Sequence, residues 1–245
     1  MKIVAICQAR MASTRLPGKM LLPLAGAPMV QRVLERVRRA EKVDKVVLAY
    51  PGTDHLAFYP TVKLFYQGFT EKQCVEFFLH YGDENDLVGR YLSAAKASGA
   101  DLIVRVPCDN PCVQPEYIDE AITRYLALPR VFVSTTVMCW KDHLYIDGLG
   151  AEVFSLSRLK WLDQATKGQP NYREHPHLLF QDQQLIEAWE QYQRHANHRE
   201  TIRLDVNTQA DYDFIADIYD HCYPTNPHFT IKDILAYLET KTVPA

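Results

Sequence analysis

Short apolar runs alternate with segments of helical periodicity along most of the chain. Ile3 to Cys7 is an apolar run rich in β-branched residues, which predicts a buried strand. After Pro28, apolar residues recur at helical spacing with arginines on the other face, and Lys45 to Tyr50 reads as a second strand. Strand, loop, helix and strand in this order form the unit from which parallel sheets are built.

The same alternation continues, and it predicts an α/β protein with a mainly parallel sheet. Asp86 is placed to cap a helix that Gly99 ends, and Ser155, Thr208 and Thr230 are placed to cap later helices. Region 137–200 is less regular, and we expect it to be an insertion that covers one face of the sheet. The remaining predicted strands cover residues 75–80, 101–106, 131–134, 151–154, 184–189 and 201–206, and the helices cover 87–98, 115–126, 155–166, 173–180, 208–223 and 230–240.

Composition narrows the classes of function. The chain has 245 residues, of which 47% are hydrophobic and 23% charged, as in a soluble globular protein. A net charge of −3 gives no general attraction to nucleic acid or to a membrane, so we expect neither as a partner. Without a long apolar stretch or a signal-peptide layout, the sequence predicts a cytoplasmic protein. Its six scattered cysteines favour reduced thiols, and neither they nor the histidines have the spacing of a zinc site.

The loop after the first strand is basic and contains small residues. Arg10, Arg15 and Lys19 gather there beside Ala9 and Ser13. Ligands of open α/β sheets bind beyond the carboxyl ends of strands, and small side chains let backbone N–H groups approach a phosphate. The loop therefore predicts an anion site, with an ordinary basic surface loop as the alternative.

The chain lacks the sequence motifs of two common kinds of nucleotide site. The chain has no GxGxxG after the first strand and no GxxxxGK[ST], which argues against a dinucleotide oxidoreductase and a P-loop NTPase. Asp109 follows the predicted strand 101–106 in a turn between two prolines. Cations near one strand end and a carboxylate near another suit a triphosphate bound with Mg²⁺, although Asp109 is also a good turn former.

These residues carry a resemblance to a known family. The run Gln8-Ala-Arg-Met-Ala-Ser-Thr-Arg-Leu-Pro-Gly-Lys19 resembles the signature of the cytidylyltransferases that make CMP-activated acidic sugars, and most of all the branch named after spore-coat polysaccharide biosynthesis protein F. Further similar blocks follow in the same order and span nearly the whole chain: residues 82–91, 105–111, 147–154, 173–175 and 203–208.

The resemblance implies a fold, an activity and an assembly. The fold is the nucleotide-diphospho-sugar transferase (GT-A-like) fold, a three-layer α/β/α sandwich, here a single nucleotidyltransferase domain over residues 1–245. Region 137–200 would then cover the acceptor or contribute to a homodimer. The implied function is Mg²⁺-dependent transfer of CMP from CTP to an acidic sugar with release of pyrophosphate, for surface polysaccharide biosynthesis. Alternatives are an enzyme that uses a sugar 1-phosphate or a phosphonate, and a non-catalytic nucleotide-binding relative.

The resemblance also implies roles for single residues. Arg15 and Lys19 would contact the triphosphate and act in catalysis, and Asp109 would bind the metal. Asp86 and Arg90 match positions near the nucleotide, although Asp86 also suits a helix cap and Arg90 a helix-face charge. The complete set of nucleotide-binding candidates is Ala9, Arg10, Ser13, Arg15, Lys19, Asp86 and Arg90.

One position departs from the family pattern. Asn207 stands where related enzymes have an aspartate, and an amide oxygen is a poorer Mg²⁺ ligand than a carboxylate. Asp205 lies two residues earlier, on the same face if residues 201–206 form a strand, and is a candidate to supply the missing charge. Otherwise Asp109 and the triphosphate hold the metal, or Asp205 and Asn207 only begin a turn.

The acceptor side has weaker candidates. Glu152, Arg173 and Glu174 lie in the predicted insertion, where they would meet the acceptor. Arg105 precedes the turn with Asp109 and is suited to bind a substrate carboxylate or to form a structural salt bridge.

Overall fold

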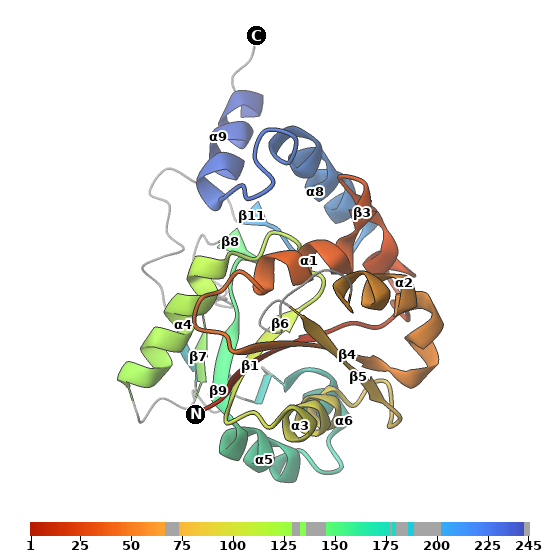
Figure 1. The fold of residues 1–245 in the computed structure, drawn as a ribbon, viewed down its shortest axis with the longest axis vertical. Coiled ribbons are helices and arrows are strands. Elements are labelled where there is room, and N and C mark those ends of the chain that lie inside the picture. Colours follow the sequence, from red (N-terminus) through yellow and green to blue (C-terminus); the bar gives the residue numbers. More distant parts are fainter. Residues whose placement is uncertain are drawn as a thin grey trace.

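A computed structural model of the chain describes residues 1–66, 74–128, 133–135, 146–176, 178–179, 186–188 and 202–242. Within these ranges the centre of the molecule is a seven-stranded sheet with the order β10-β7-β9-β6-β1-β4-β5 (Figure 1). Its strands are β1 (Ile3–Gln8), β4 (Lys45–Pro51), β5 (Val75–His80), β6 (Leu102–Pro107), β7 (Val133–Thr135), β9 (Glu152–Ser155) and β10 (Ile186–Ala188).

The sheet is mainly parallel, as predicted, with one reversed strand. β1 pairs in parallel with β4 and β6, and β4 pairs in parallel with β5. β9 runs antiparallel to both of its neighbours, β6 and β7, which the alternating pattern did not predict. The carboxyl ends of β1, β4 and β6 therefore lie at one edge of the sheet, and β9 begins at that edge.

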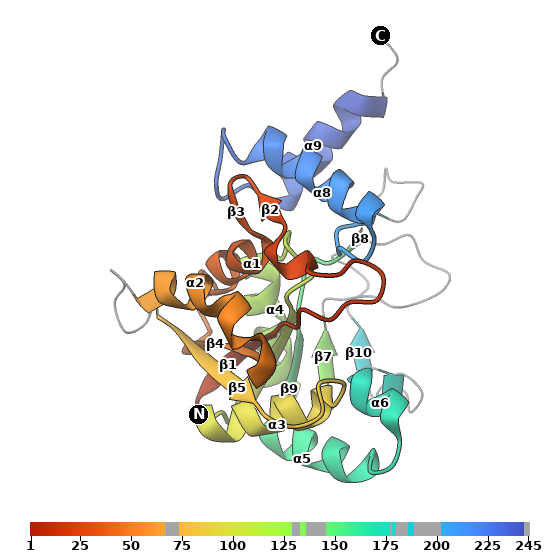
Figure 2. The same cartoon turned by 90° about the vertical axis from the view of Figure 1, so that its right-hand side faces the viewer.

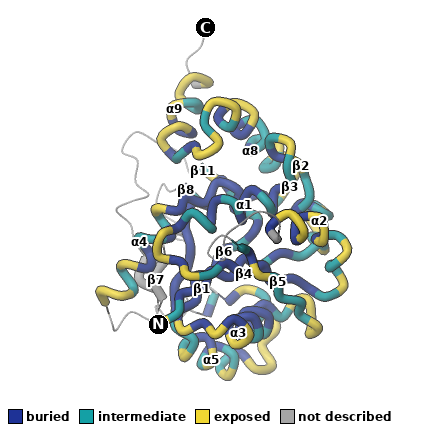
Figure 3. Tube along the Cα trace, viewed as in Figure 1, coloured by how far each residue is buried: buried dark blue, intermediate teal, exposed yellow. Residues whose placement is uncertain are grey.

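Helices cover both faces of the sheet (Figures 1 and 2). Ile3, Ala5 and Cys7 of β1 belong to one buried cluster, and Val4 and Ile6 belong to the other, as expected for a strand buried on both faces. The central strands β1, β4 and β6 are almost entirely buried, whereas only Val75 is buried in the edge strand β5 (Figure 3). The first cluster includes α1 (Met29–Val37), α2 (His55–Tyr66) and α4 (Pro115–Ala127), and the second includes α3 (Leu87–Ser98), α5 (Leu156–Ala165) and part of α6 (Pro170–Glu174).

The C-terminal helices extend the first of these faces (Figure 2). They are α8 (Gln209–Cys222) and α9 (Ile231–Thr242), and α8 contacts a small hairpin of β2 (Pro23–Leu24) and β3 (Ala27–Pro28). The hairpin turn is Ala25-Gly26, with φ of 45° and 79°. A two-residue turn of this kind needs positive φ at both positions, which alanine rarely adopts. The sequence therefore gave little indication of it.

A second small sheet joins two distant segments. β8 (Ile146–Asp147) pairs in parallel with β11 (Ile202–Arg203). The strand predicted over 201–206 was wrong beyond Arg203: the N–H of Leu204 still bonds to the carbonyl of Asp147 at 3.1 Å, but the chain bends at Asp205. Residue 201 lies outside the described ranges.

Most of the other predicted elements are confirmed. Asp86 caps α3, and Gly99 ends that helix with φ of 69°. The short helix predicted over 173–180 is seen only in part: α6 begins at Pro170 and ends at Glu174, residues 176, 178 and 179 are again helical, and residues 177 and 180 lie outside the described ranges. Of the strands predicted over 131–134 and 184–189, residues 133–134 and 186–188 are seen in β7 and β10, while 131–132, 184–185 and 189 lie outside these ranges.

The described part of region 137–200 is built into the molecule. It supplies β9 and β10 to the central sheet, and α5 and α6 to one face. A role of this region in covering an acceptor or forming a dimer stays a prediction. Among the described helices, none has the length and apolar character needed to cross a bilayer.

Candidate active site

A cavity of about 600 Å³ opens where the loop after β1 meets the turn after β6. Its walls come from the basic loop, the turn that holds Asp109, the segment 203–207 and the chain around α6. Seven of the residues predicted to bind the nucleotide or the metal line it: Arg10, Ser13, Arg15, Lys19, Asp109, Asp205 and Asn207.

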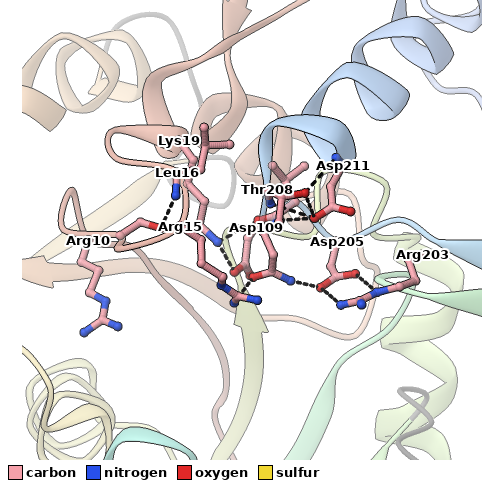
Figure 4. Close-up of polar contacts among 12 residues, drawn as sticks. Arg10, Arg15, Leu16, Lys19, Asp109, Arg203, Asp205, Thr208 and Asp211 are labelled. Atoms are coloured by element: carbon pink, nitrogen blue, oxygen red, sulfur yellow. Dashed lines mark hydrogen bonds and ion pairs between the residues drawn. The ribbon is translucent and has the colours of Figure 1, made fainter.

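Lys19 and Asp109 meet in this cavity. Gly18 adopts the left-handed conformation, with φ of 71°, and leads into a short 3-10 helix, Lys19–Leu21. The Nζ of Lys19 lies 2.8 Å from Oδ2 of Asp109 and donates to the carbonyl of Val206 at 2.7 Å (Figure 4). Lys19 is only 7% exposed, so its charge acts in partly desolvated surroundings, where electrostatic interactions are strong.

A chain of polar contacts continues from Arg15 along segment 203–207. Arg15 Nη2 donates to Oδ1 of Asn207 at 2.7 Å, and Nδ2 of Asn207 donates to Oδ2 of Asp205. Asp205 also pairs with Arg203 at 3.3 Å (Figure 4). Asp205 and Asn207 therefore do contact each other, although they lie in a segment that bends at Asp205 rather than in a strand.

The start of α8 fixes this segment. Thr208 caps the helix, and Asp211 completes a capping box. The Oδ2 of Asp211 also accepts from the N–H of Asn207 at 3.0 Å. Burial acts to raise the pKa of Asp211, but the hydrogen bonds from Thr208 and Asn207 hold this pKa below its usual value. The backbone of Asn207 is thus part of the helix cap.

Asp147 is a cavity residue to which sequence reasoning assigned no role. Burial, followed by the charge of Asp205, raises the pKa of Asp147 to about 6, against a hydrogen bond from the N–H of Gly148. Gly148 has φ of 84°, and a Cβ there would lie 2.7 Å from the backbone of Leu204. Gly148 is the sequence feature that could have indicated this part of the site, because a glycine allows this close approach of two chain segments.

The oxygen donors suit a metal ion that is shared with phosphates. Among the described residues, no group of three or more His, Cys, Asp or Glu side chains is placed to hold a metal ion. Mg²⁺ in nucleotide sites is usually bound by one or two carboxylates together with phosphate oxygens and water. Asp109 and Asp205 fit that requirement in their chemistry, and the metal itself stays a prediction.

Arg10 bridges two elements beside the cavity. Its Nη1 donates to Oδ1 of Asn85 at 2.5 Å, and its Nη2 pairs with Oε1 of Glu174 in α6 at 2.8 Å. Arg173 fixes α6 on the other side, because it pairs with Asp86 at 2.8 Å and with Asp163 of α5 at 3.0 Å. Glu174, a predicted acceptor contact, lines the cavity, whereas Arg173 acts as a brace behind it.

Asp86, Arg90 and Ala9 do not line the cavity in the described part of the chain. Asp86 accepts the N–H of Gly89 at 2.8 Å as the cap of α3. Arg90 is fully buried, which lowers its pKa, and it donates to the carbonyls of Glu84 and Ala9. Ala9 itself continues β1 with a 3.1 Å hydrogen bond to Ala49. These residues support the loop after β1, and their nucleotide contacts stay predictions.

Arg105 and Glu152 form a buried ion pair in the cavity wall. They lie opposite each other on β6 and β9, and Nη1 of Arg105 is 2.7 Å from Oε1 of Glu152. Burial has the largest single effect on the pKa of Arg105 and acts to lower it, but the charge and the hydrogen bond of Glu152, together with Tyr91 and Asp109, raise this pKa overall. The salt bridge that sequence reasoning left open is therefore present, and both residues also line the cavity.

Comparison with known proteins agrees with this fold and site. A family model described as cytidylyltransferase matches residues 4–226. The spore coat polysaccharide biosynthesis protein SpsF of Bacillus subtilis is 27% identical, over 89% of this chain and 86% of the relative. The 3-deoxy-manno-octulosonate cytidylyltransferase of Geobacter sulfurreducens is 41% identical, but the match covers 55% of this chain and half of that enzyme. A cytidylyltransferase structure from Leptospira borgpetersenii superposes with a TM-score of 0.81 at 26% identity, over 98% of this chain and 95% of that one.

The protein belongs to the cytidylyltransferase family. It is therefore a nucleotidyltransferase, and the predicted family and fold class are confirmed.

Proposed function

We propose that this protein transfers CMP from CTP to an acidic sugar, or a similar acceptor, in a Mg²⁺-dependent reaction that releases pyrophosphate. The observation that carries the proposal is the meeting of Lys19 and Asp109, 2.8 Å apart in the cavity. A metal-bound triphosphate needs a cation for its phosphate oxygens and a carboxylate for its metal at one place. Arg15 and Asp205 add one group of each kind nearby.

The proposed chemistry needs no nucleophile from the protein. The oxygen of an acceptor hydroxyl forms a bond to the α-phosphorus of CTP and gives up its proton to water, while the bond from that phosphorus to the oxygen of the β-phosphate breaks. Pyrophosphate leaves with the electron pair of the broken bond. Lys19 and Arg15 stabilise the negative charge that develops on the phosphoryl and leaving oxygens, because positioning and charge neutralisation dominate phosphoryl transfer. Mg²⁺ bound by Asp109 and Asp205 would add positive charge at the same oxygens.

The acceptor class is supported by relatives and by the site. The names of the B. subtilis and G. sulfurreducens relatives point to polysaccharide biosynthesis and to an acidic sugar. In this chain Glu174 and the pair Arg105–Glu152 line the cavity on the side of α6 and β9. We propose that the acceptor binds on the side of α6 and β9. We also propose that the protein acts as a homodimer in the cytoplasm.

A non-catalytic relative would bind CTP without consuming it. Asn207 suggested that alternative, because it removes a carboxylate from the expected position. The contact of Asn207 with Asp205 keeps a carboxylate beside that position, which favours the catalytic proposal.

The test is a pyrophosphate-release assay with each of the four nucleoside triphosphates, with and without Mg²⁺. Acidic sugars, including 3-deoxy-manno-octulosonate, form one acceptor panel, and sugar 1-phosphates and phosphonates form another. We expect release only with CTP, Mg²⁺ and an acidic sugar. Release with ATP or GTP but not with CTP would contradict the assignment, and release with the second panel alone would change the acceptor.

A further inference from the structure

Asn207 lies between a cation and an anion at the edge of the cavity. Its Oδ1 accepts from Nη2 of Arg15 at 2.7 Å, and its Nδ2 donates to Oδ2 of Asp205. Arg15 belongs to the basic loop and Asp205 to the segment before α8, and Figure 4 shows both in the same part of the site. One amide thus connects two parts of the site that are far apart in the sequence.

Only one orientation of the amide satisfies both neighbours. A guanidinium offers only donors, so it must meet the amide oxygen, and a carboxylate offers only acceptors, so it must meet the amide nitrogen. The backbone of Asn207 is held as well, because its N–H donates to Asp211 at 3.0 Å. The side chain is therefore fixed in both position and direction.

This arrangement is poorly suited to metal binding by Asn207 itself. The oxygen is the metal-binding atom of an amide, and here Arg15 occupies it. A cation that bound this oxygen would have to approach the guanidinium closely. The carboxylate of Asp205, in contrast, is oriented by the amide nitrogen and carries the negative charge that a metal ion prefers.

We propose that Asn207 is a positioning residue, which holds Asp205 for the metal and Arg15 for the triphosphate, and that the metal-binding carboxylate of this chain has moved to Asp205. The inference rests on the proposed function. An aspartate at position 207 would face Asp205 with a like charge and would bind Arg15 in an ion pair, so both partners would be worse placed for CTP and its metal.

The experiment measures the affinity for CTP by calorimetry, with and without Mg²⁺ and in the absence of an acceptor. Asn207→Asp should weaken binding in Mg²⁺ by about tenfold, as expected for a like-charge contact and a sequestered arginine. Asn207→Ala should also weaken it, because both bonds are lost. If Asn207 were a weak metal ligand, Asn207→Asp would instead bind CTP and Mg²⁺ more tightly than the wild type.

A charge exchange tests the second part of the proposal. Asp205→Asn should abolish the gain in CTP affinity that Mg²⁺ provides, and Asp205→Asn combined with Asn207→Asp should restore part of it, since one carboxylate and one amide again face each other. The matched control is Gln209→Glu, which adds the same charge two residues further on at an exposed position and should leave affinity unchanged.

Two outcomes would overturn the inference while leaving the function intact. One is wild-type or better affinity in Asn207→Asp, and the other is unchanged Mg²⁺ dependence in Asp205→Asn. Failure of the wild-type protein to bind CTP in the presence of Mg²⁺ would overturn the proposed function, and the inference with it. Thermal unfolding of each variant shows whether the fold is retained.

Discussion

Two groups of cations in this protein have very different partners. Arg32 and Arg36 of α1 are buried against the C-terminal helices, and their guanidinium groups lie 4.1 Å from the ring centroids of Tyr223 and Phe229, respectively. Arg32 also donates to the carbonyls of Leu24 and Ala25 at 2.9 and 2.5 Å. Arg36 donates to the carbonyl of Phe229 at 3.1 Å.

Each cation of the loop after β1 has a side-chain partner at the cavity, and Lys19 also donates to the carbonyl of Val206 at 2.7 Å. Arg10, Arg15 and Lys19 pair with Glu174, Asn207 and Asp109, and all of these partners line the cavity. Backbone carbonyls and aromatic faces deep in the protein cannot be exchanged for a ligand without unfolding, whereas side chains at a cavity can turn away when a phosphate enters. The location of the partners distinguishes the two groups, because Arg32 also has a side-chain partner, Glu35 at 2.8 Å, which is not among the described residues that line the cavity.

The largest effect is expected at Lys19. Lys19→Ala should lower turnover by about 10²- to 10³-fold, the usual cost of losing one group that stabilises charge in the transition state. Lys19→Met, which keeps most of the buried stem, should show the same loss, and both variants should retain the fold by circular dichroism. An unchanged rate of CTP-dependent pyrophosphate release would contradict a catalytic role for this lysine.

Arg36 should give the opposite pattern. Arg36→Met should lower the free energy of unfolding by about 2 to 4 kcal/mol, because it removes a buried cation–π contact and leaves the carbonyl of Phe229 without its donor. The affinity for CTP should not change. Urea unfolding measures the first quantity and calorimetry the second, and the half-buried neighbour Arg39, changed to Met, serves as the control. If an Arg36 variant folded but lost affinity for CTP, this would contradict the distinction between the buried arginines of α1 and the cations of the loop after β1.

A smaller effect is expected at Asp147, an acidic residue of the cavity. Because its pKa is raised to about 6, the folded protein holds its proton more tightly than the unfolded chain does. The stability that the protonated side chain of Asp147 contributes to the folded state is fully present below pH 4 and is lost as the pH rises through 6. Asp147→Asn should therefore stabilise the protein by about 1 to 2 kcal/mol at pH 7.5 without added metal, and the difference should vanish near pH 4. Urea unfolding at both pH values checks this, and equal stability of the two proteins at pH 7.5 would contradict it.

The sequence predicted those parts of the molecule that depend on local pattern. The strand over Ile3 to Cys7, the cap at Asp86 and the helix end at Gly99 each follow from a few neighbouring residues, and the structure contains all three. The cations of the basic loop and Asp109 were predicted to lie together because parallel strands bring their carboxyl ends to one edge.

The remaining features depend on contacts between distant residues. Arg173 meets Asp86 across 87 positions of sequence, and Arg15 meets Asn207 across 192. Neither pairing follows from spacing or periodicity, because each requires the packing of several elements. The turn at Ala25 was missed for a different reason, since its positive φ is imposed by the hairpin against the preference of the residue.

The reversed direction of β9 has a consequence for redesigning acceptor choice. Glu152 is the first residue of β9, so the segment that reaches the cavity here comes before the strand, whereas for β1 and β6 it comes after. That segment is tightly held: a Cβ at Gly148 would lie only 2.7 Å from the backbone of Leu204, and the carbonyl of Leu149 accepts from the N–H of Gln114 at 2.8 Å. A loop grafted between Gly148 and Glu152 would disturb the contacts of this segment with Leu204 and with Gln114. An insertion after Ser155 would lie at the opposite edge of the sheet, away from the cavity.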